Sequence, residues 1–183
     1  MGIYFPDIFK IDRLYALCYA LQNVKRMNKK NELDNEIIVI GGGAAGLMAA
    51  GRAAEAGAKV LLLEKTDGYG KKILISGKMR CNLTNTSDLN HFISMYGKNG
   101  RFLFSAFHHF FRPELLDFLN SHGLATKVER GGRIFPVSDD AHDVLSVFKN
   151  YLSVNHVQTK LNTKVTGVMI KDTAVCGVKT HNK

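Results

Sequence analysis

Three glycines and one glutamate in this chain have the spacing of a site that holds a diphosphate. Gly41, Gly43 and Gly46 form a G-x-G-x-x-G run, and Glu64 follows 18 residues after the last glycine. In such a run the first glycine permits a tight turn, the second leaves the backbone open to a ligand, and the third lets a helix pack closely against a strand. The backbone amides at the start of that helix then face the phosphates with a partial positive charge.

The segments around the glycines are those that such a site requires. Residues 36–40 are mostly branched and apolar, the pattern of a strand buried on both faces of a parallel sheet. Residues 44–56 are rich in helix formers, and residues 59–64 are typical of a second buried strand. Strand, helix and strand together predict a βαβ unit, in which Ala44 and Ala45 open the helix.

Glu64 ends the second strand, where a carboxylate can accept hydrogen bonds from the ribose of an adenine nucleotide. Its charge repels a 2′-phosphate, so NADP is not expected at this position. A glycine run alone is a weak signal, and a strand-end carboxylate alone is usually solvated. With strand, helix and carboxylate all in place, a dinucleotide site is the preferred interpretation, although the unit does not choose between NAD and FAD.

Two longer stretches resemble one family of flavoproteins. The first, residues 70–85, reads GKKILISGKMRCNLTN, and the second, residues 131–145, reads GGRIFPVSDDAHDVL. Both are similar to motifs of bacterial FAD-dependent oxidoreductases of the aminoacetone oxidase-like or NAD(P)/FAD-dependent group, which have two dinucleotide-binding folds. The resemblance covers residues 36–179. It implies that FAD binds with its adenine half on the βαβ unit and its isoalloxazine ring near residues 76–85.

The side chains of the first stretch, which we expect to form a loop, suit a flavin beside them. Lys72 and Arg80 can offset the charge of a pyrophosphate or of reduced flavin, and Ser76 and Asn82 can hydrogen-bond the polar edge of the ring. Without the resemblance, a solvated polar loop would be preferred. We interpret Cys81 as a small buried thiol rather than a reactive one. The expected cofactor site comprises Gly41, Gly43, Ala44, Ala45, Gly46, Glu64, Lys65, Lys72, Ser76, Arg80, Cys81 and Asn82, with no catalytic acid or base and no metal ligand assigned.

The chain departs from this family in two ways. The family's loop reads S-G-x-G-R-C-N, but Met79 stands here in place of the second glycine. A side chain there is strained if the backbone requires a positive φ. The chain is also much shorter than the family's members, so we expect a fragment or truncated product that lacks the second half of the FAD-binding sheet.

The remaining segments supply elements around this site. Residues 101–111 and 113–122 predict two helices, and Ser138 is expected to cap a third. Residues 157–179 alternate in the manner of strands joined by tight turns, one of them at Asn162. The expected fold class is therefore α/β: a Rossmann-like FAD-binding βαβ unit with a partial parallel sheet, inserted helices and a C-terminal antiparallel β meander.

The N-terminal residues are expected to stand apart from this domain. We interpret residues 1–35 as an extension and polar linker, and residues 36–183 as the N-terminal portion of an FAD-binding domain. Apolar residues recur at helical spacing from Ile8 to Leu21 and predict an amphipathic helix, but the run is too short to span a membrane and does not resemble a signal peptide. Our hypothesis is that translation begins at Met27 and that the preceding residues are not native.

Composition is that of an ordinary globular protein, with 45% hydrophobic and 22% charged residues. Three scattered cysteines without a C-x-x-C pair predict neither a disulfide framework nor a dithiol or zinc site, so we expect the cytoplasm. The net charge of +9 can attract anionic partners. Because the basic clusters are short, a lysine-rich solvated surface is the preferred explanation.

Three hypotheses about function follow. The first is the FAD-binding portion of an oxidoreductase that transfers hydride between a reductant, with NAD(P)H as one candidate, and an unidentified small organic substrate. The second is a non-catalytic nucleotide-binding remnant, which Met79 and the short chain favour. The third, an RNA-associated flavoprotein, rests on the net charge and is placed last. We expect no metal, no transmembrane segment and no nucleic-acid partner.

Overall fold

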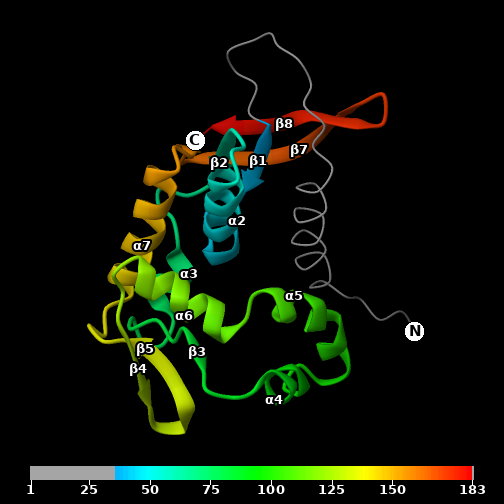
Figure 1. The fold of residues 1–183 in the computed structure, drawn as a ribbon. Coiled ribbons are helices and arrows are strands. Elements are labelled where there is room, and N and C mark those ends of the chain that lie inside the picture. The colour runs from blue at the N-terminus through cyan, green and yellow to red at the C-terminus, as the bar shows by residue number, and fades with distance from the viewer. Residues whose placement is uncertain (1–35, 183) are drawn as a thin grey trace. The chain divides into compact units, whose positions relative to one another are not determined.

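The computed structural model describes residues 36–182, which fall into two compact units (Figure 1). The first unit joins the chain up to Gly68 to the chain from Val154 onward, and the second unit spans Tyr69–Ser153. The N-terminal extension and linker, the amphipathic helix and the start at Met27 all concern residues outside the described range. Those three expectations stay predictions.

A three-stranded parallel sheet organises the first unit. Strands β1 (Ile37–Ile40), β2 (Val60–Leu63) and β6 (Gln158–Lys160) lie in the order β1-β2-β6. Helix α2 (Ala44–Glu55) connects β1 to β2, which pair in parallel from Ile37↔Val60 to Ile40↔Leu63. The predicted βαβ unit is confirmed, with each element within a residue of its expected bounds.

Packing explains why these residues form the unit. Leu47, Ala50 and Ala53 of α2 have no exposed surface, so the helix lies close to the sheet through small and apolar side chains. Gly57, with a φ of 93°, ends the helix in the left-handed conformation that glycine allows. The prediction that strand β1 is buried on both faces is wrong for its last residue, Ile40. Among the described strands β1 lies at the sheet edge, and its Ile40 is 45% exposed.

The last two strands of the first unit form a hairpin. Strands β7 (Thr163–Lys171) and β8 (Ala174–Asn182) pair antiparallel, and the turn residues Asp172 and Thr173 have φ angles of 47° and 68°. The meander is thus one strand shorter than expected, because β6 pairs in parallel with β2 instead of with β7. The α/β fold class is confirmed, with a parallel Rossmann-like sheet and additional antiparallel strands.

The second unit contains a small antiparallel sheet with helices around it. Its strands are β3 (Thr84–Asn85), β5 (Arg133–Pro136) and β4 (Thr126–Glu129), in the order β3-β5-β4. Phe135 of β5 and Leu119 are almost completely buried and mark the core of the unit. The helices are α3 (Lys71–Ile75), α4 (Leu89–Ser94), the 3-10 helix η1 (Gly97–Leu103), α5 (Phe104–His109), α6 (Arg112–Ser121), the 3-10 turn η2 (Arg130–Gly132) and α7 (Ala141–Val154).

Three details of this unit differ from the sequence prediction. Helix α3 forms inside the expected loop, and the helix expected over residues 101–111 is divided between η1 and α5. Asp140, not Ser138, caps α7, since its Oδ1 accepts a hydrogen bond from His142 N at 2.7 Å. Asp139 has a φ of 57°, which a helix does not allow, so α7 begins only after it. Within residues 36–182, none of the helices has the length and apolarity needed to cross a bilayer.

Candidate cofactor-binding site

Glu64, predicted to accept hydrogen bonds from a ribose, binds directly to the glycine loop. Its Oε2 accepts a hydrogen bond from Gly42 N at 2.7 Å, and its Oε1 accepts from Thr66 N and Thr66 Oγ1, both at 2.8 Å. Because β1 and β2 run in parallel, their carboxyl ends meet at one edge of the sheet and bring the carboxylate to the loop. Glu64 is only 9% exposed, so it is not a solvated carboxylate at the end of a strand.

These hydrogen bonds keep Glu64 ionised and leave room for a further donor. Burial by itself raises the pKa of the Glu64 carboxyl, but the hydrogen bonds from Gly42 and Thr66 and the charge of Lys65 outweigh it and hold the pKa below its ordinary value. A carboxylate offers about four acceptor positions. Described residues use three of them, with one bond on Oε2, so that oxygen can still accept a ribose hydroxyl.

The geometry at positions 41, 43 and 46 explains why each is a glycine. Gly41 has a φ of 101°, a conformation that residues with side chains rarely adopt. A Cβ at Gly46 would lie 1.9 Å from the backbone oxygen of Gly41, so a side chain there would force α2 away from the loop. A Cβ at Gly43 would meet nothing within 4 Å, so this position faces open space. These are the structural roles that the sequence pattern predicts for the three positions.

The start of α2 is open to an anion. Gly43 provides no side-chain cap, the first turn holds no acidic residue, and the first backbone bond of the helix runs from Leu47 N to Gly43 O. Among the described residues, none accepts a hydrogen bond from the amides of Ala44 or Ala45. Free amides beside open space fit a diphosphate, and the acceptor position on Glu64 fits the sugar of the same nucleotide.

The other predicted residues lie in the second unit, on α3 and the loop after it. Lys72 is exposed on α3, and Ser76 ends that helix with its hydroxyl donating to Ile73 O at 2.9 Å. Cys81 is 6% exposed, and burial raises the pKa of its thiol, partly opposed by a hydrogen bond from Ser76. The interpretation of Cys81 as a small buried thiol is therefore confirmed.

The loop itself follows a left-handed path. Gly77, Lys78, Met79 and Cys81 have φ angles of 57°, 58°, 68° and 60°. Met79 thus occupies a conformation suited to the glycine of the family's motif, at a cost of about 1–2 kcal/mol. Met79 as a residue is 64% exposed, and its backbone oxygen accepts a hydrogen bond from Ala141 N at 3.0 Å.

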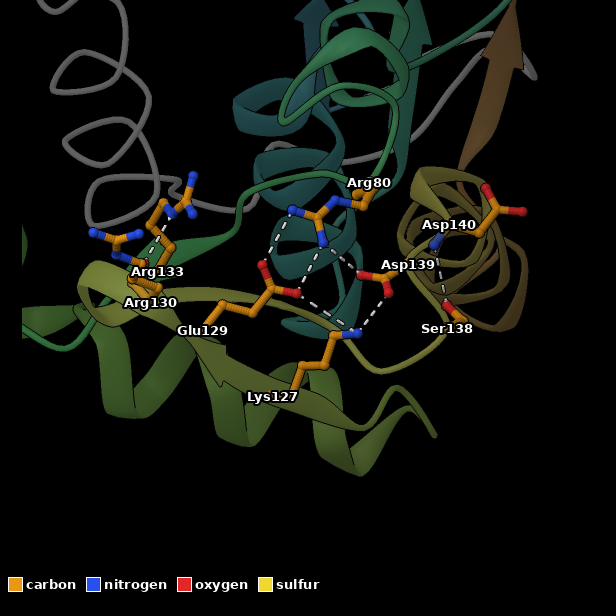
Figure 2. A network of polar contacts seen from close by, with 8 residues as sticks. All are labelled: Arg80, Lys127, Glu129, Arg130, Arg133, Ser138, Asp139 and Asp140. Carbon is orange, nitrogen blue, oxygen red and sulfur yellow. Dashed lines mark hydrogen bonds and ion pairs between the residues drawn. The ribbon is translucent and has the colours of Figure 1, made fainter.

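Arg80, predicted to offset a cofactor charge, is paired with two carboxylates (Figure 2). Its Nη1 and Nη2 donate to the two oxygens of Glu129 at 2.8 and 3.1 Å, and Nη1 also donates to Asp139 Oδ1 at 3.0 Å. Lys127 bridges the same pair, at 2.5 Å from Asp139 Oδ2 and 3.7 Å from Glu129 Oε1. The guanidinium also lies over the ring of Phe135, 4.1 Å from its centroid.

The predicted site residues therefore fall into two groups. The first unit holds the glycine loop and the residues near it in the sequence: Gly41, Gly43, Ala44, Ala45, Gly46, Glu64 and Lys65. The second unit holds the residues of α3 and of the loop after it: Lys72, Ser76, Arg80, Cys81 and Asn82. Sequence reasoning missed Thr66, although a hydroxyl two residues after the glutamate was a local signal. It also missed Glu129 and Asp139, which lie 49 and 59 residues after Arg80 and give no local signal.

A glycine loop, an open helix start and a buried carboxylate on the adjacent strand define a Rossmann-type dinucleotide-binding domain. The model of the HI0933-like protein Rossmann domain matches residues 35–183, so the chain belongs to that family. Membership supports FAD as the cofactor, as the resemblance implied. The chain carries the FAD-binding Rossmann domain of flavoprotein oxidoreductases.

Comparison with known proteins agrees with this assignment. The chain is 40% identical over 134 residues to the 3-dehydro-bile acid delta(4,6)-reductase of Clostridium scindens, a match covering 72% of the chain and 32% of that enzyme. It is 32% identical over 139 residues to the ribosomal RNA dihydrouridine synthase of Escherichia coli, covering 75% and 34%. An open-conformation flavocytochrome c3 fumarate reductase shares the fold, with a TM-score of 0.60 and 20% identity over 100% of this chain and 35% of that one. The chain thus spans about a third of its curated relatives.

Proposed function

We propose that this chain is the FAD-binding part of a reductase that adds hydride to a carbon–carbon double bond conjugated with a carbonyl group. The names of the two curated relatives support one shared chemistry. A 3-dehydro, delta(4,6) bile acid carries its double bonds in conjugation with the C3 carbonyl. Dihydrouridine arises when the double bond of uracil next to a carbonyl is reduced. In both cases a hydride and a proton add across an electron-poor double bond.

The observation that carries the proposal is the contact of Glu64 with Gly42 beside the open start of α2. When bound, FAD supplies the hydride chemistry. The residues of the chain bind and orient it. The amides of Ala44 and Ala45 hold the diphosphate, Gly43 leaves the space that it needs, and Glu64 fixes the loop and accepts a ribose hydroxyl.

The domain limits and the cellular location are parts of the same proposal. The match to residues 35–183 supports residues 36–183 as the N-terminal portion of the FAD-binding domain, with residues 1–35 as a separate extension. Cys81 and Cys176 are both free thiols, which supports a reducing compartment such as the cytoplasm. NAD(P)H is the proposed reductant.

A second candidate substrate is a nucleobase within RNA rather than a small molecule. The 32% identity to a ribosomal RNA dihydrouridine synthase favours it, together with the net charge of +9. The basic residues are spread along the chain instead of forming one block, and the 40% identical relative is named for a small molecule. The small-molecule substrate is therefore the first choice.

FAD binding by the purified chain is the first test. A visible flavin band that stays with the protein on gel filtration is expected, with stabilisation of about 2.7 kcal/mol at a hundredfold excess of FAD over its Kd. Gly43→Ala places a methyl group in the open space and should weaken binding, whereas Gly68→Ala, also in open space but outside the loop, should not. A chain that never retains FAD contradicts the proposal.

Substrate class is tested by reoxidation of the photoreduced, FAD-loaded protein without oxygen. A conjugated steroid dienone, an isolated alkene of similar size and a uridine-containing RNA are compared as electron acceptors. Reoxidation by the dienone and not by the alkene is expected. Reoxidation by the RNA alone favours the second candidate, and reoxidation by none contradicts reductase activity of this chain on its own.

A further inference from the structure

The loop of residues 77–81 has a backbone path that its sequence disfavours. Lys78, Met79 and Cys81 carry side chains, yet all three have positive φ angles. Such residues cost free energy and persist only where surrounding contacts fix the backbone more strongly than the local preference opposes it. Some contact outside the loop must therefore hold it.

Backbone hydrogen bonds hold the loop where it closes and at Met79, its middle residue. Cys81 N donates to Ser76 O at 3.0 Å, which closes the loop, and Ala141 N donates to Met79 O at 3.0 Å. The bond inside the loop, from Arg80 N to Gly77 O, is long at 3.4 Å. The side chain of Arg80 adds ion pairs from the loop to residues outside it, Glu129 and Asp139.

Arg80 joins the loop to two separate elements. Glu129 lies at the end of β4, and Asp139 lies in the turn before α7. A single exposed ion pair contributes little, but a bidentate arginine within a network of four charges has a defined geometry. Phe135 adds to it, since the guanidinium covers its ring and a Cβ at Gly77 would lie 2.9 Å from the same ring.

The charges of the network also speak against a direct contact with the cofactor. Arg80 and Lys127 supply two positive charges, and Glu129 and Asp139 supply two negative ones, so the group is neutral (Figure 2). Three of the five N–H donors of Arg80, two on Nη1 and one on Nη2, are directed at carboxylates of the chain. Its charge is therefore already balanced within the network.

We propose that Arg80 is a positioning residue that acts through Glu129 and Asp139 to hold residues 77–81 in their left-handed path. It does not contact FAD. The role of this loop beside the flavin rests on the proposed function, but the holding of the loop does not. Cys81, buried in the same loop, provides a reporter of its opening.

The test measures the rate at which a thiol reagent modifies Cys81 in a C18S/C176S background without cofactor. Arg80→Gln and Glu129→Gln should each raise the rate by about tenfold or more through local opening of the loop. Arg130→Gln is the matched control, because Arg130 is an exposed arginine of the same unit outside the network, and it should leave the rate unchanged. An unchanged rate in Arg80→Gln overturns the proposal.

Two further measurements separate a local role from a general one. Amide protection of the β4–β5 pairing should persist in Arg80→Gln, and its loss would overturn the proposal in favour of general destabilisation. The double variant R80Q/E129Q should react little faster than Arg80→Gln alone, because the pair between Arg80 and Glu129 is already lost in that single variant. Additive effects contradict it. Arg80→Lys should restore part of the protection, since lysine keeps the charge but not the bidentate geometry.

FAD affinity distinguishes positioning from contact. If Arg80 acts through Glu129, Arg80→Gln and Glu129→Gln weaken FAD binding alike and change the spectrum of the bound flavin in the same way. If Arg80 contacts FAD itself, Glu129→Gln frees it, and affinity is unchanged or tighter, which overturns the proposal. Failure of the unsubstituted chain to bind FAD contradicts the proposed function, and the labelling rates still decide the role of Arg80.

Discussion

Two loops in this chain hold unusual backbone conformations by opposite means. The glycine loop of the first unit uses residues without side chains where the backbone is left-handed or closely packed, and the buried carboxylate of Glu64 ties it to the neighbouring strand. The loop of residues 77–81 places Lys78 and Met79 in left-handed conformations, and partly exposed ion pairs of Arg80 hold it. The first loop thus carries little strain, whereas the second depends on distant partners.

Substitution of Gly46 has the largest expected effect on the first loop. Gly46→Val places side-chain atoms against Gly41 O, because a Cβ would already lie 1.9 Å from it, and we expect a loss of about 3 kcal/mol of unfolding free energy. Gly43→Ala enters open space and should change stability by less than about 0.5 kcal/mol. Urea unfolding measures both. Equal losses at the two positions would show that the loop is not packed as described.

Loss of the Glu64 carboxylate should have the second-largest effect on stability. In Glu64→Gln one side-chain oxygen becomes an NH₂ group that faces a backbone N–H, either that of Gly42 or that of Thr66. We expect a loss of about 2 kcal/mol, because a buried donor is left without an acceptor. Glu36→Gln, at an exposed glutamate of the same unit, should be neutral. A neutral result at Glu64 would contradict its role in fixing the loop.

The pH dependence of this difference has a defined sign. The pKa of Glu64 is lowered in the folded state, so its contribution is fully present above its unfolded value, about 4.3, and is lost as the pH falls through the folded value. Glutamine does not titrate. The stability gap between the unsubstituted chain and Glu64→Gln should therefore be constant from neutral pH to about pH 5 and then close. A stability gap that widens as the pH falls would contradict the lowered pKa of Glu64.

The two loops should respond differently to salt, with a smaller effect than the substitutions at Gly46 and Glu64. At 1 M salt the Debye length is about 3 Å, so the exposed pairs of Arg80 weaken while the buried bonds of Glu64 do not. We expect the labelling rate of Cys81 to rise by about threefold in the unsubstituted chain and to stay constant in Arg80→Gln. The stability gap at Glu64 should not change with salt. Salt dependence at Glu64 and not at Arg80 would reverse the comparison.

The same contrast explains how much the sequence could predict. The βαβ unit, the three glycine roles and the position of Glu64 were predictable, because each depends on residues within one short segment. The pairing of β6 with β2 was not, since alternation predicts a strand and not its partner. The partners of Arg80 lie on β4 and before α7, and only the folded chain brings them together. The motif therefore predicted a loop, and only the structure shows which carboxylates pair with its arginine.

Restoration of the family's glycine at position 79 should give the smallest change in stability. Met79→Gly removes a side chain from a left-handed position, with a φ of 68°, and we expect a gain of about 0.5–1 kcal/mol after the entropy cost of glycine. The matched control is Met95→Gly, at a methionine of similar exposure whose φ is −64°. There the same substitution should cost about 0.5–1 kcal/mol. Urea unfolding measures the change in unfolding free energy for both variants. A gain at Met79 with a loss at Met95 shows strain at Met79. A loss at both positions shows that the contacts around Arg80 have fully relieved that strain.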